Sequence, residues 1–217
     1  SISNTVTIEQ QGPRNTVTGI SGTNAIISGQ SNNVYIHQGS SSNPNLSQFE
    51  LYGNNNTVSL NQGYIPGNLP SLSSLNFSDN GGHISYLYIL GNTNSLGIQQ
   101  TNNGGSNSGH YVETTVIGGS NVMSLQQINN GSKELYVDVT GSYNNINVSQ
   151  KGTGTHYGDI NVSGNSNVIS LTQDSSSAKY ATINATNAGG NSNISVSQTG
   201  NTPAAVVVNQ ILSLIHI

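Results

Sequence analysis

Basic side chains recur at a fixed interval in the second half of the chain, and side chains repeated in this way could bind a ligand together. The four residues, each 23 positions after the last, are His110, Lys133, His156 and Lys179. Three of them are followed by tyrosine, at Tyr111, Tyr157 and Tyr180. In a regular repeat they would form a surface stripe for an anionic or carbohydrate ligand, gaining charge below pH ~6.5. The alternative, which we favour, is a set of solvated residues at loop-to-strand junctions, where edge charges discourage misassociation.

Two further sets of side chains could contact a ligand. Several of the ten tyrosines fall at outward or loop positions, where they could stack on sugars or anchor an interface. A flat polar face of Ser, Thr and Asn could bind ice, a polysaccharide or another fibre. Its two columns are Ser124, Asn147, Ser170 and Ser195, and Gln126, Ser149, Thr172 and Ser197. For both sets, an ordinary sheet surface is the simpler interpretation.

The residue types needed for catalysis or metal binding do not assemble in the sequence. The eight acidic residues form no convincing general acid/base pair, and Glu113 and Asp159 share a column with Tyr136 between them. The five histidines show no metal-ligand spacing, and the chain has no cysteine. We therefore expect no catalytic residues, no metal site, no cofactor and no enzymatic activity.

Composition excludes other classes of protein. Only 6% of the residues are charged, and four Lys and Arg against eight Asp and Glu leave no basic footprint for nucleic acid. No apolar run approaches the ~20 residues of a membrane-spanning helix. Together, 34 Asn and 26 Gly indicate a turn-rich chain, and its apolar content is too high for disorder.

An internal repeat organises the chain. The pattern G-x-x-N-x5-Q occurs six times with unchanged spacing, and strict spacing disfavours a disordered prion-like segment. The six copies are Gly29/Asn32/Gln38, Gly53/Asn56/Gln62, Gly91/Asn94/Gln100, Gly118/Asn121/Gln127, Gly141/Asn144/Gln150 and Gly164/Asn167/Gln173. Partial copies start at Asn4, which lacks the glycine, and at Ser192, which replaces the asparagine.

The repeat predicts a strand, a tight turn and a second strand in each unit. Between Asn and Gln, apolar residues occupy the second and fourth positions, as in Val34 and Ile36. A period of two indicates a strand with one buried face, and Asn and Gln share the parity of that face. An apolar alternation also precedes each glycine, as at Leu135, Val137 and Val139. Gly supplies positive φ at the turn, and Asn tolerates it.

Such a unit cannot stand alone, because two short strands bury too little apolar surface to offset the entropy of ordering them. We therefore expect an all-β fold: a flattened, two-sheet β-solenoid of strand–turn–strand rungs, about 23 residues each, stacked in parallel. Hairpin pairing within a unit is the competing geometry. Parallel stacking places equivalent residues of neighbouring rungs next to each other, so inward Asn and Gln would form amide ladders.

The predicted domain is a single solenoid of about eight rungs over residues 1–211. An incomplete ninth rung falls at Val206, Val208 and Gln210, and residues 64–82 are interpreted as a surface loop. Residues 212–217 match the translation of a common sequencing adaptor, so we interpret the chain as a fragment of an open reading frame.

The repeat resembles the curlin repeat, S-x5-Q-x-G-x-x-N-x5-Q, over residues 4 to about 198. Curlins are subunits of curli, the extracellular amyloid fibres that build bacterial biofilm matrix and adhere to surfaces. The resemblance implies a β-solenoid with inward ladders at the Gly, Asn and Gln positions given above. It covers the second half of the motif. Two residues before the glycine, where curlin has Gln, this chain has an aliphatic residue. Eight before it, where curlin has Ser, the regular section of this chain has His110, Lys133, His156 and Lys179.

The resemblance implies a non-catalytic, extracellular, structural or adhesive protein that assembles with copies of itself, end to end or laterally. The alternative is a virion fibre, spike or surface-adhesin module that binds a host surface or polysaccharide. Uniform units favour the fibre subunit, whereas loop inserts at 64–82 and at Asn102 to Gly109 favour recognition. We expect neither a nucleic-acid partner nor a membrane-spanning segment.

Overall fold

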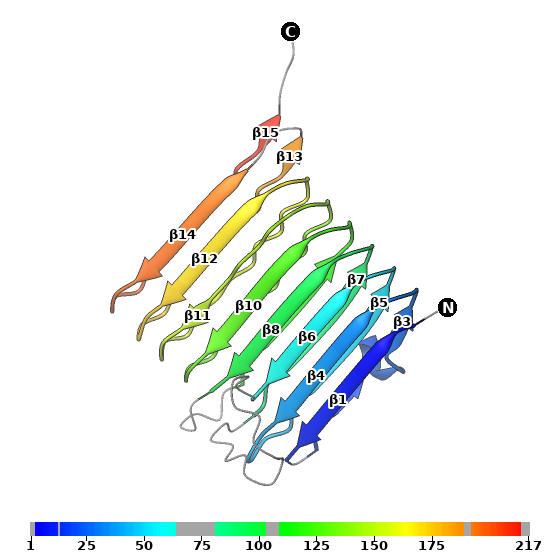
Figure 1. Cartoon of the computed structure of the whole chain (residues 1–217). Coiled ribbons are helices and arrows are strands. Elements are labelled where there is room, and N and C mark those ends of the chain that lie inside the picture. The colour runs from blue at the N-terminus through cyan, green and yellow to red at the C-terminus, as the bar shows by residue number, and fades with distance from the viewer. Residues whose placement is uncertain (1–2, 13, 64–80, 103–108, 189–191, 214–217) are drawn as a thin grey trace.

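The chain folds into a β-solenoid with all of its long elements in β-strands. The structure, a computed structural model, describes residues 3–12, 14–63, 81–102, 109–188 and 192–213 (Figure 1). It is 48% strand and 2% helix, and it makes about six turns, about 27 residues apart. The all-β, parallel-stacked solenoid is therefore confirmed. The mean spacing is longer than the predicted 23 residues, because insertions lengthen the earlier turns.

The segments from Asn to Gln form one sheet, here called sheet A, in which all neighbours are parallel. Like residues face each other, as in the register Val34↔Val58↔Leu96. The predicted parallel stacking is thus confirmed, and hairpin pairing is not observed in this sheet. Its strands in spatial order are β1 (Thr5–Gln11), β4 (Asn33–Gly39), β6 (Thr57–Gln62), β8 (Ser95–Thr101), β10 (Val122–Ile128), β11 (Gln150–Lys151), β12 (Val168–Asp174) and β14 (Asn193–Thr199).

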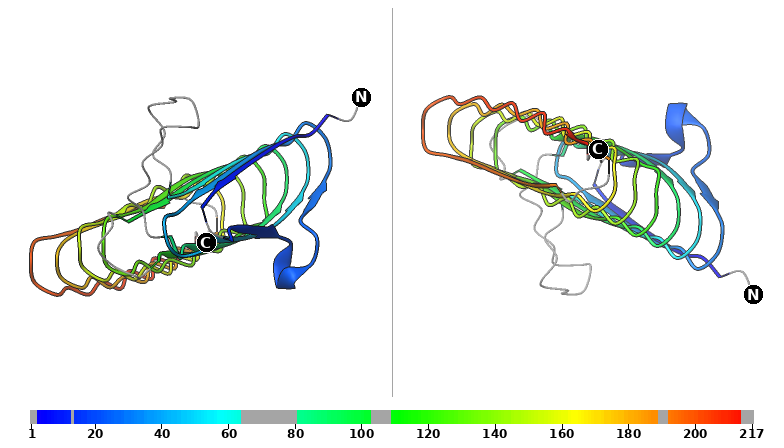
Figure 2. Two further views of the ribbon diagram at one scale, coloured as in Figure 1. Left: turned by 90° about the horizontal axis from the view of Figure 1, so that it is seen from below. Right: turned by 90° about the horizontal axis from the view of Figure 1, so that it is seen from above.

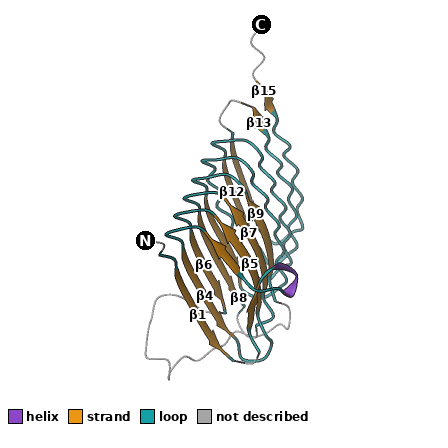
Figure 3. Cartoon of the chain, turned by 90° about the vertical axis from the view of Figure 1, so that its right-hand side faces the viewer, coloured by secondary structure: helices purple, strands orange, loops and turns teal. Residues whose placement is uncertain are grey.

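The segments before each glycine form the opposite layer, sheet B, which packs against sheet A across the core (Figures 2 and 3). A short 3-10 helix, η1 (Ile20–Gly22), projects beside this layer between β2 and β3. The strands of sheet B are β2 (Thr16–Thr18), β5 (Leu46–Tyr52), β7 (Ile84–Leu90) and β9 (Tyr111–Val116), with β3 (Ile26–Ser28) pairing β5. A separate parallel pair joins β13 (Asn187–Ala188) to β15 (Leu212–Ser213).

The later rungs depart from the predicted strands on the sheet B side. Residues 133–139, 156–162 and 179–185 run alongside β9 but pair through isolated bridges, such as Val139↔Val162 and Asn161↔Asn184. Their backbones carry runs of positive φ, for example 106° at Val137 and 138° at Ile160. Such φ values turn the peptide groups away from regular ladder directions, so continuous strands do not form. The apolar side chains of these segments still point inward and are buried.

Two layers of aliphatic side chains fill the solenoid. Val34, Leu60 and Ile146 of the sheet A side and Leu51, Ile89 and Val162 of the sheet B side have no exposed surface. Each rung covers the apolar face of its neighbours, as expected for a solenoid. The first rung is less covered, and Val6 and Ile8 of β1 remain 47% exposed.

The turn between the two layers repeats in every complete motif. Gly29, Gly53 and Gly91 have the predicted positive φ, between +126° and +132°. Gly118, Gly141 and Gly164 do not, so the prediction for the motif glycine is confirmed in three copies and wrong in the other three. The second residue with positive φ is not the motif Asn but the residue before it, with φ of 56–61°. These residues are Ser31, Asn55, Thr93, Ser120, Tyr143 and Ser166. The Asn is thereby free to point inward.

The buried Asn side chains form a continuous ladder. Asn32 Nδ2 donates to the carbonyl oxygen of Gly53 in the next rung at 2.8 Å, and its Oδ1 accepts from the backbone N–H of Asn56 at 2.9 Å. The same two bonds recur at Asn56, Asn94, Asn121 and Asn144. Asn167 Oδ1 has no hydrogen-bond partner, and the next position of the ladder holds Ser192. The motif thus couples each Asn to the turn glycine one rung away.

The Gln side chains form a second ladder with a single direction. Each Nε2 donates to the Oε1 of the Gln in the next rung at 2.6–3.0 Å. The series runs from Gln10 through Gln38, Gln62, Gln100, Gln127, Gln150 and Gln173 to Gln198. Gln198 Nε2 is buried and has no hydrogen-bond partner. Pairing like with like satisfies these buried amides, and it does so only in the predicted register.

Candidate functional site

The four basic residues predicted as a surface stripe, or as solvated junction residues, point into the solenoid instead. His110 is 1% exposed, and Lys133, His156 and Lys179 are fully buried. Backbone bonds place Asn15, Asn45 and His83 in the same register, and we call these seven residues the loop-end column. Both predictions for the basic side chains were wrong, because each basic residue shares the inward parity of its segment and lies two positions before the next buried residue. The accompanying Tyr111, Tyr157 and Tyr180 do point outward.

The loop-end column hydrogen-bonds the loops that connect sheet A to sheet B. In four rungs, its side chain donates to the carbonyl of the residue that follows the ladder Gln. These bonds are Asn15 to Gln11 (2.8 Å), Asn45 to Gly39 (3.1 Å), His110 to Thr101 (3.0 Å) and His156 to Lys151 (2.5 Å). A loop carbonyl turned into the interior requires such a donor. The shared task explains why both Asn and His occur at this position.

Lys133 performs this task for two rungs at once. Its Nζ lies 2.8–3.1 Å from four carbonyl oxygens, those of Asn130, Gly131, Gly152 and Gly154. Lys179 Nζ likewise bonds the carbonyls of Gly200 and Thr202 in the following loop. The positive charge is thus balanced by backbone dipoles rather than by a carboxylate. Burial lowers the pKa of Lys133 to about 8.

Burial disfavours the charged forms of His110 and His156. His110 and His156 use Nε2–H to reach a carbonyl, and their buried Nδ1 atoms have no partner. His83 Nδ1 accepts the backbone N–H of His110 at 3.0 Å, which excludes a proton there. Burial, reinforced by the neighbouring His83, lowers the pKa of His110 to about 3. Burial also lowers the pKa of His156.

Replacement of Lys133 tests its role as a donor to the loops. Lys133→Met is expected to lower the free energy of unfolding by about 2 kcal/mol, because several inward carbonyls lose a charged donor at once. Backbone amides at 129–131 and 152–154 should exchange faster in hydrogen-exchange measurements. The control is Lys151→Met, at a half-exposed lysine of β11. Equal effects of the two substitutions would contradict the assignment.

The outer face of sheet B carries a row of tyrosines. The rings of Tyr86, Tyr111, Tyr136 and Tyr157 follow one another with centroid distances of 5.6–5.7 Å and interplanar angles of 63–67°. The row zigzags between two outward columns, because like positions in neighbouring rungs hold Tyr and an acid in turn. Tyr52 and Tyr88 form a further pair with centroids 6.0 Å apart. Edge-to-face contacts of this kind favour a fixed ring arrangement.

Acidic side chains alternate with these rings. Glu50, Glu113, Glu134, Asp138 and Asp159 project from the same face, and they are five of the eight acidic residues of the chain. The Tyr111 hydroxyl donates to Glu113 at 2.7 Å, and that of Tyr52 donates to Glu50 at 3.2 Å. Burial and the Glu113 carboxylate raise the pKa of Tyr111. Tyrosine rings and carboxylates together make what we call the tyrosine–acid face.

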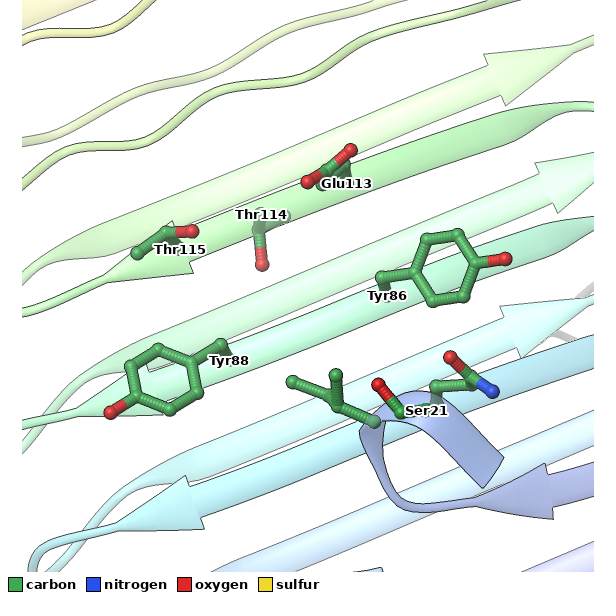
Figure 4. Close-up of a pocket in the computed structure, with 8 residues that line it drawn as sticks. Ser21, Tyr86, Tyr88, Glu113, Thr114 and Thr115 are labelled. Carbon is green, nitrogen blue, oxygen red and sulfur yellow. The ribbon is translucent and has the colours of Figure 1, made fainter. Parts of the chain in front are cut away.

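A hollow of about 310 Å³ lies at one end of this face (Figure 4). Ile20 and Ser21 of η1 form one wall, and Tyr86 and Tyr88 of β7 form another. Glu113 and Thr115 of β9 complete the lining on the far side. The hollow combines aromatic surface with a few polar groups, as ligand sites do. Sequence reasoning placed some tyrosines outward and noted Tyr136 between Glu113 and Asp159, but it missed the continuous row of rings. The shared parity of these residues before each turn glycine was the available signal.

The outer face of sheet A is the predicted polar surface. Ser170 pairs with Ser195 and Thr172 with Ser197 in the β12–β14 register, and these four side chains are half-buried or exposed. A shallower hollow of about 160 Å³ lies around Gly97, between Ser59 and Ser124. The polar columns are therefore present as predicted, while binding of ice or a polysaccharide to them stays a prediction.

In the part of the chain that the structure describes, His, Asp and Glu do not gather in groups of three that could hold a metal ion. Within those ranges, no helix has the length and apolarity to cross a membrane. The predicted loop at 64–82 and the insert from 102 to 109 lie largely outside the described residues.

Comparison of the chain with protein-family models, with curated proteins and with solved structures finds no match. The fold therefore defines the class, a parallel β-solenoid with internal Asn and Gln ladders. The resemblance to the curlin repeat rests on the spacing of Gly, Asn and Gln alone.

Proposed function

We propose that the chain is a non-catalytic structural or adhesive protein of the extracellular matrix or cell surface, curlin-like, that assembles with its own copies. The observation that carries this proposal is the one-way Gln ladder. Its last amide, Gln198 Nε2, is a buried donor without a partner. A rung stacked on β14 that places a Gln in register would accept this bond.

Strand β1 of a second copy supplies such a rung. Gln10 donates to Gln38 through its Nε2, so its Oε1 can accept the bond from Gln198 of another copy, and β1 is the first strand of sheet A with its other edge open for stacking. Val6 and Ile8, half exposed on this strand, would meet Ile194 and Val196 in the register that β12 and β14 use. Unpaired strand edges favour addition of this kind.

Electron microscopy of the purified chain over several days tests the assembly. Unbranched fibres that lengthen with time and seed fresh protein are expected. The variant Val6→Lys/Ile8→Lys should stop fibre growth but keep the fold, because both side chains are already 47% exposed. Thr7→Lys, on the outward face of the same strand, is the matched control and should still form fibres. Discrete rods that neither grow nor seed would overturn the proposal.

A second candidate function is recognition, as in a virion fibre or a surface-adhesin module. The tyrosine–acid face favours it, because a purely structural sheet needs neither a row of ordered rings nor five carboxylates on one side. Rods that stay discrete but bind a surface polymer would favour this candidate.

A further inference from the structure

We infer that the tyrosine–acid face binds a cationic amino-sugar polysaccharide, laid along the solenoid axis with its pyranose rings on the tyrosine rings. The face runs along the side of the stack, from the hollow beside η1, which Figure 4 shows, to Tyr157. Binding there does not require assembly, so this inference can hold whether or not the chain forms fibres.

The charge of the tyrosine–acid face determines the sign of the charge that its ligand must carry. Five carboxylates project from this face, whereas the lysines of its rungs, Lys133 and Lys179, point inward and are fully buried. Among the described residues, the remaining lysine and arginine are Lys151 of β11 in sheet A and Arg14 ahead of β2. The face therefore has no cation of its own to neutralise it, and it complements a positively charged partner.

The placement of the acids favours a ligand with an ammonium group beside each apolar ring. Tyr136 lies between Glu113 and Asp159 in one outward column, and Glu134 lies between Tyr111 and Tyr157 in the other. Any ring stacked on Tyr136 thus has carboxylates on two sides. An ammonium over a tyrosine face gains a cation–π attraction, and the adjacent carboxylates add hydrogen-bond acceptors.

The spacing of the rings separates a glycan from a basic peptide. One tyrosine ring follows the next at 5.6–5.7 Å, with one ring per rung from β7 onward. An extended peptide presents side chains on one side roughly every 6.6 Å, which falls out of step with rungs about 4.8 Å apart. Neighbouring tyrosine rings are tilted 63–67° to each other, so a linear glycan, whose pyranoses are close to a phenol ring in size, would stack on alternate rings of the row.

The hollow fixes one end of the ligand. Its 310 Å³ volume is bounded by Ile20 and Ser21 of η1, which rise above the otherwise flat sheet. Tyr86 and Tyr88 form its aromatic wall, and Glu113 and Thr115 supply polar groups for an amine and hydroxyls. A terminal sugar seated here would set the register of the units that follow.

Calorimetric titration of the full chain with a glucosamine hexamer tests the inference, at a pH that keeps the amines protonated. Saturable binding is expected, weakened by rising salt. The neutral N-acetylglucosamine hexamer should bind at least about tenfold more weakly, and so should a lysine hexapeptide. If the lysine peptide bound as tightly as the amino sugar, charge alone would explain the binding and the inference would fail.

Variants locate the binding to this face. Tyr136→Ala and the pair Glu113→Gln/Asp159→Asn are each expected to lower affinity about tenfold or more. Two matched controls lie elsewhere: Tyr143→Ala, a tyrosine 70% exposed at a turn, and Glu9→Gln, an acid of β1 in sheet A. Loss of binding in the controls as large as in the face variants would overturn the assignment, as would unchanged binding in the face variants. Circular dichroism confirms that each variant is folded, and electron microscopy reads assembly separately.

Discussion

Gly53→Ala is expected to lower the free energy of unfolding by about 4 kcal/mol, in spite of adding a single methyl group. Its φ is +130°, and an added Cβ would lie 1.7 Å from the carbonyl oxygen of Gly91 in the next rung. That oxygen is the acceptor for Asn56 Nδ2 at 2.9 Å. The methyl group must therefore push the next rung away and break the Asn ladder at this step.

Gly97→Ala is the matched control for this substitution. Gly97 lies on the outward face of β8, and nothing stands within 4 Å of the Cβ that alanine would add. Urea unfolding followed by circular dichroism should show a large loss for the Gly53 variant and little change for the Gly97 variant. Similar stabilities for the two variants would contradict the ladder argument.

The motif itself allowed most of the fold to be predicted. Apolar residues at alternate positions placed Asn32, Gln38 and their equivalents inside, and an unpaired buried amide requires its own copy as partner. That requirement selects parallel stacking in one register. The curlin-like part of the motif, which carries Gly, Asn and Gln, is also the part with regular strands in most rungs.

The rest could not be derived from local patterns. Residues 133–140 have the alternation of a strand, yet positive φ at Val137 to Thr140 gives isolated bridges. Alternation reports which side chains face inward, and that part of the prediction is confirmed. It does not report how the peptide groups are oriented when the neighbouring rung has the same irregular backbone.

The loop-end column shows more clearly what local sequence patterns fail to predict. A lysine or histidine beside a loop is normally solvated. The neighbouring sequence gives no signal that the loop carbonyls turn inward. Counting eight residues back from Gly53 and Gly91 would have added Asn45 and His83 to the column. Asn at that position indicates a hydrogen-bonding task rather than a charged stripe.

The buried histidines make the solenoid sensitive to acid. The pKa of His110 is about 3 in the folded chain and about 6.5 in the unfolded chain. Above pH ~6.5, both states hold the ring neutral, and stability is unaffected. As the pH falls, the unfolded chain binds a proton that the folded chain excludes, so stability falls until pH ~3. The largest loss from this residue is about 5 kcal/mol.

Because carboxylates also titrate at low pH, the contribution of His110 has to be measured as a difference between two chains. His110→Asn is the matched variant, since Asn15 and Asn45 already occupy this column and donate to the equivalent loop carbonyls. Unfolding free energies of both chains, measured from pH 7 down to pH 4, should converge or cross as the pH falls. Parallel pH profiles would show that His110 takes up no proton on unfolding.

Lys133 gives a dependence of the same sign in a separate window at the alkaline end, so the two groups of the column can be told apart by pH. Its pKa is about 8 in the folded chain, against about 10.5 in the unfolded chain. Between these values the unfolded chain holds more protons, so stability should rise with pH through this window. A neutral amine still donates to the loop carbonyls, so the hydrogen bonds persist while the buried charge is removed. Lys133→Met should abolish the alkaline rise but keep the acid loss, whereas His110→Asn should do the reverse.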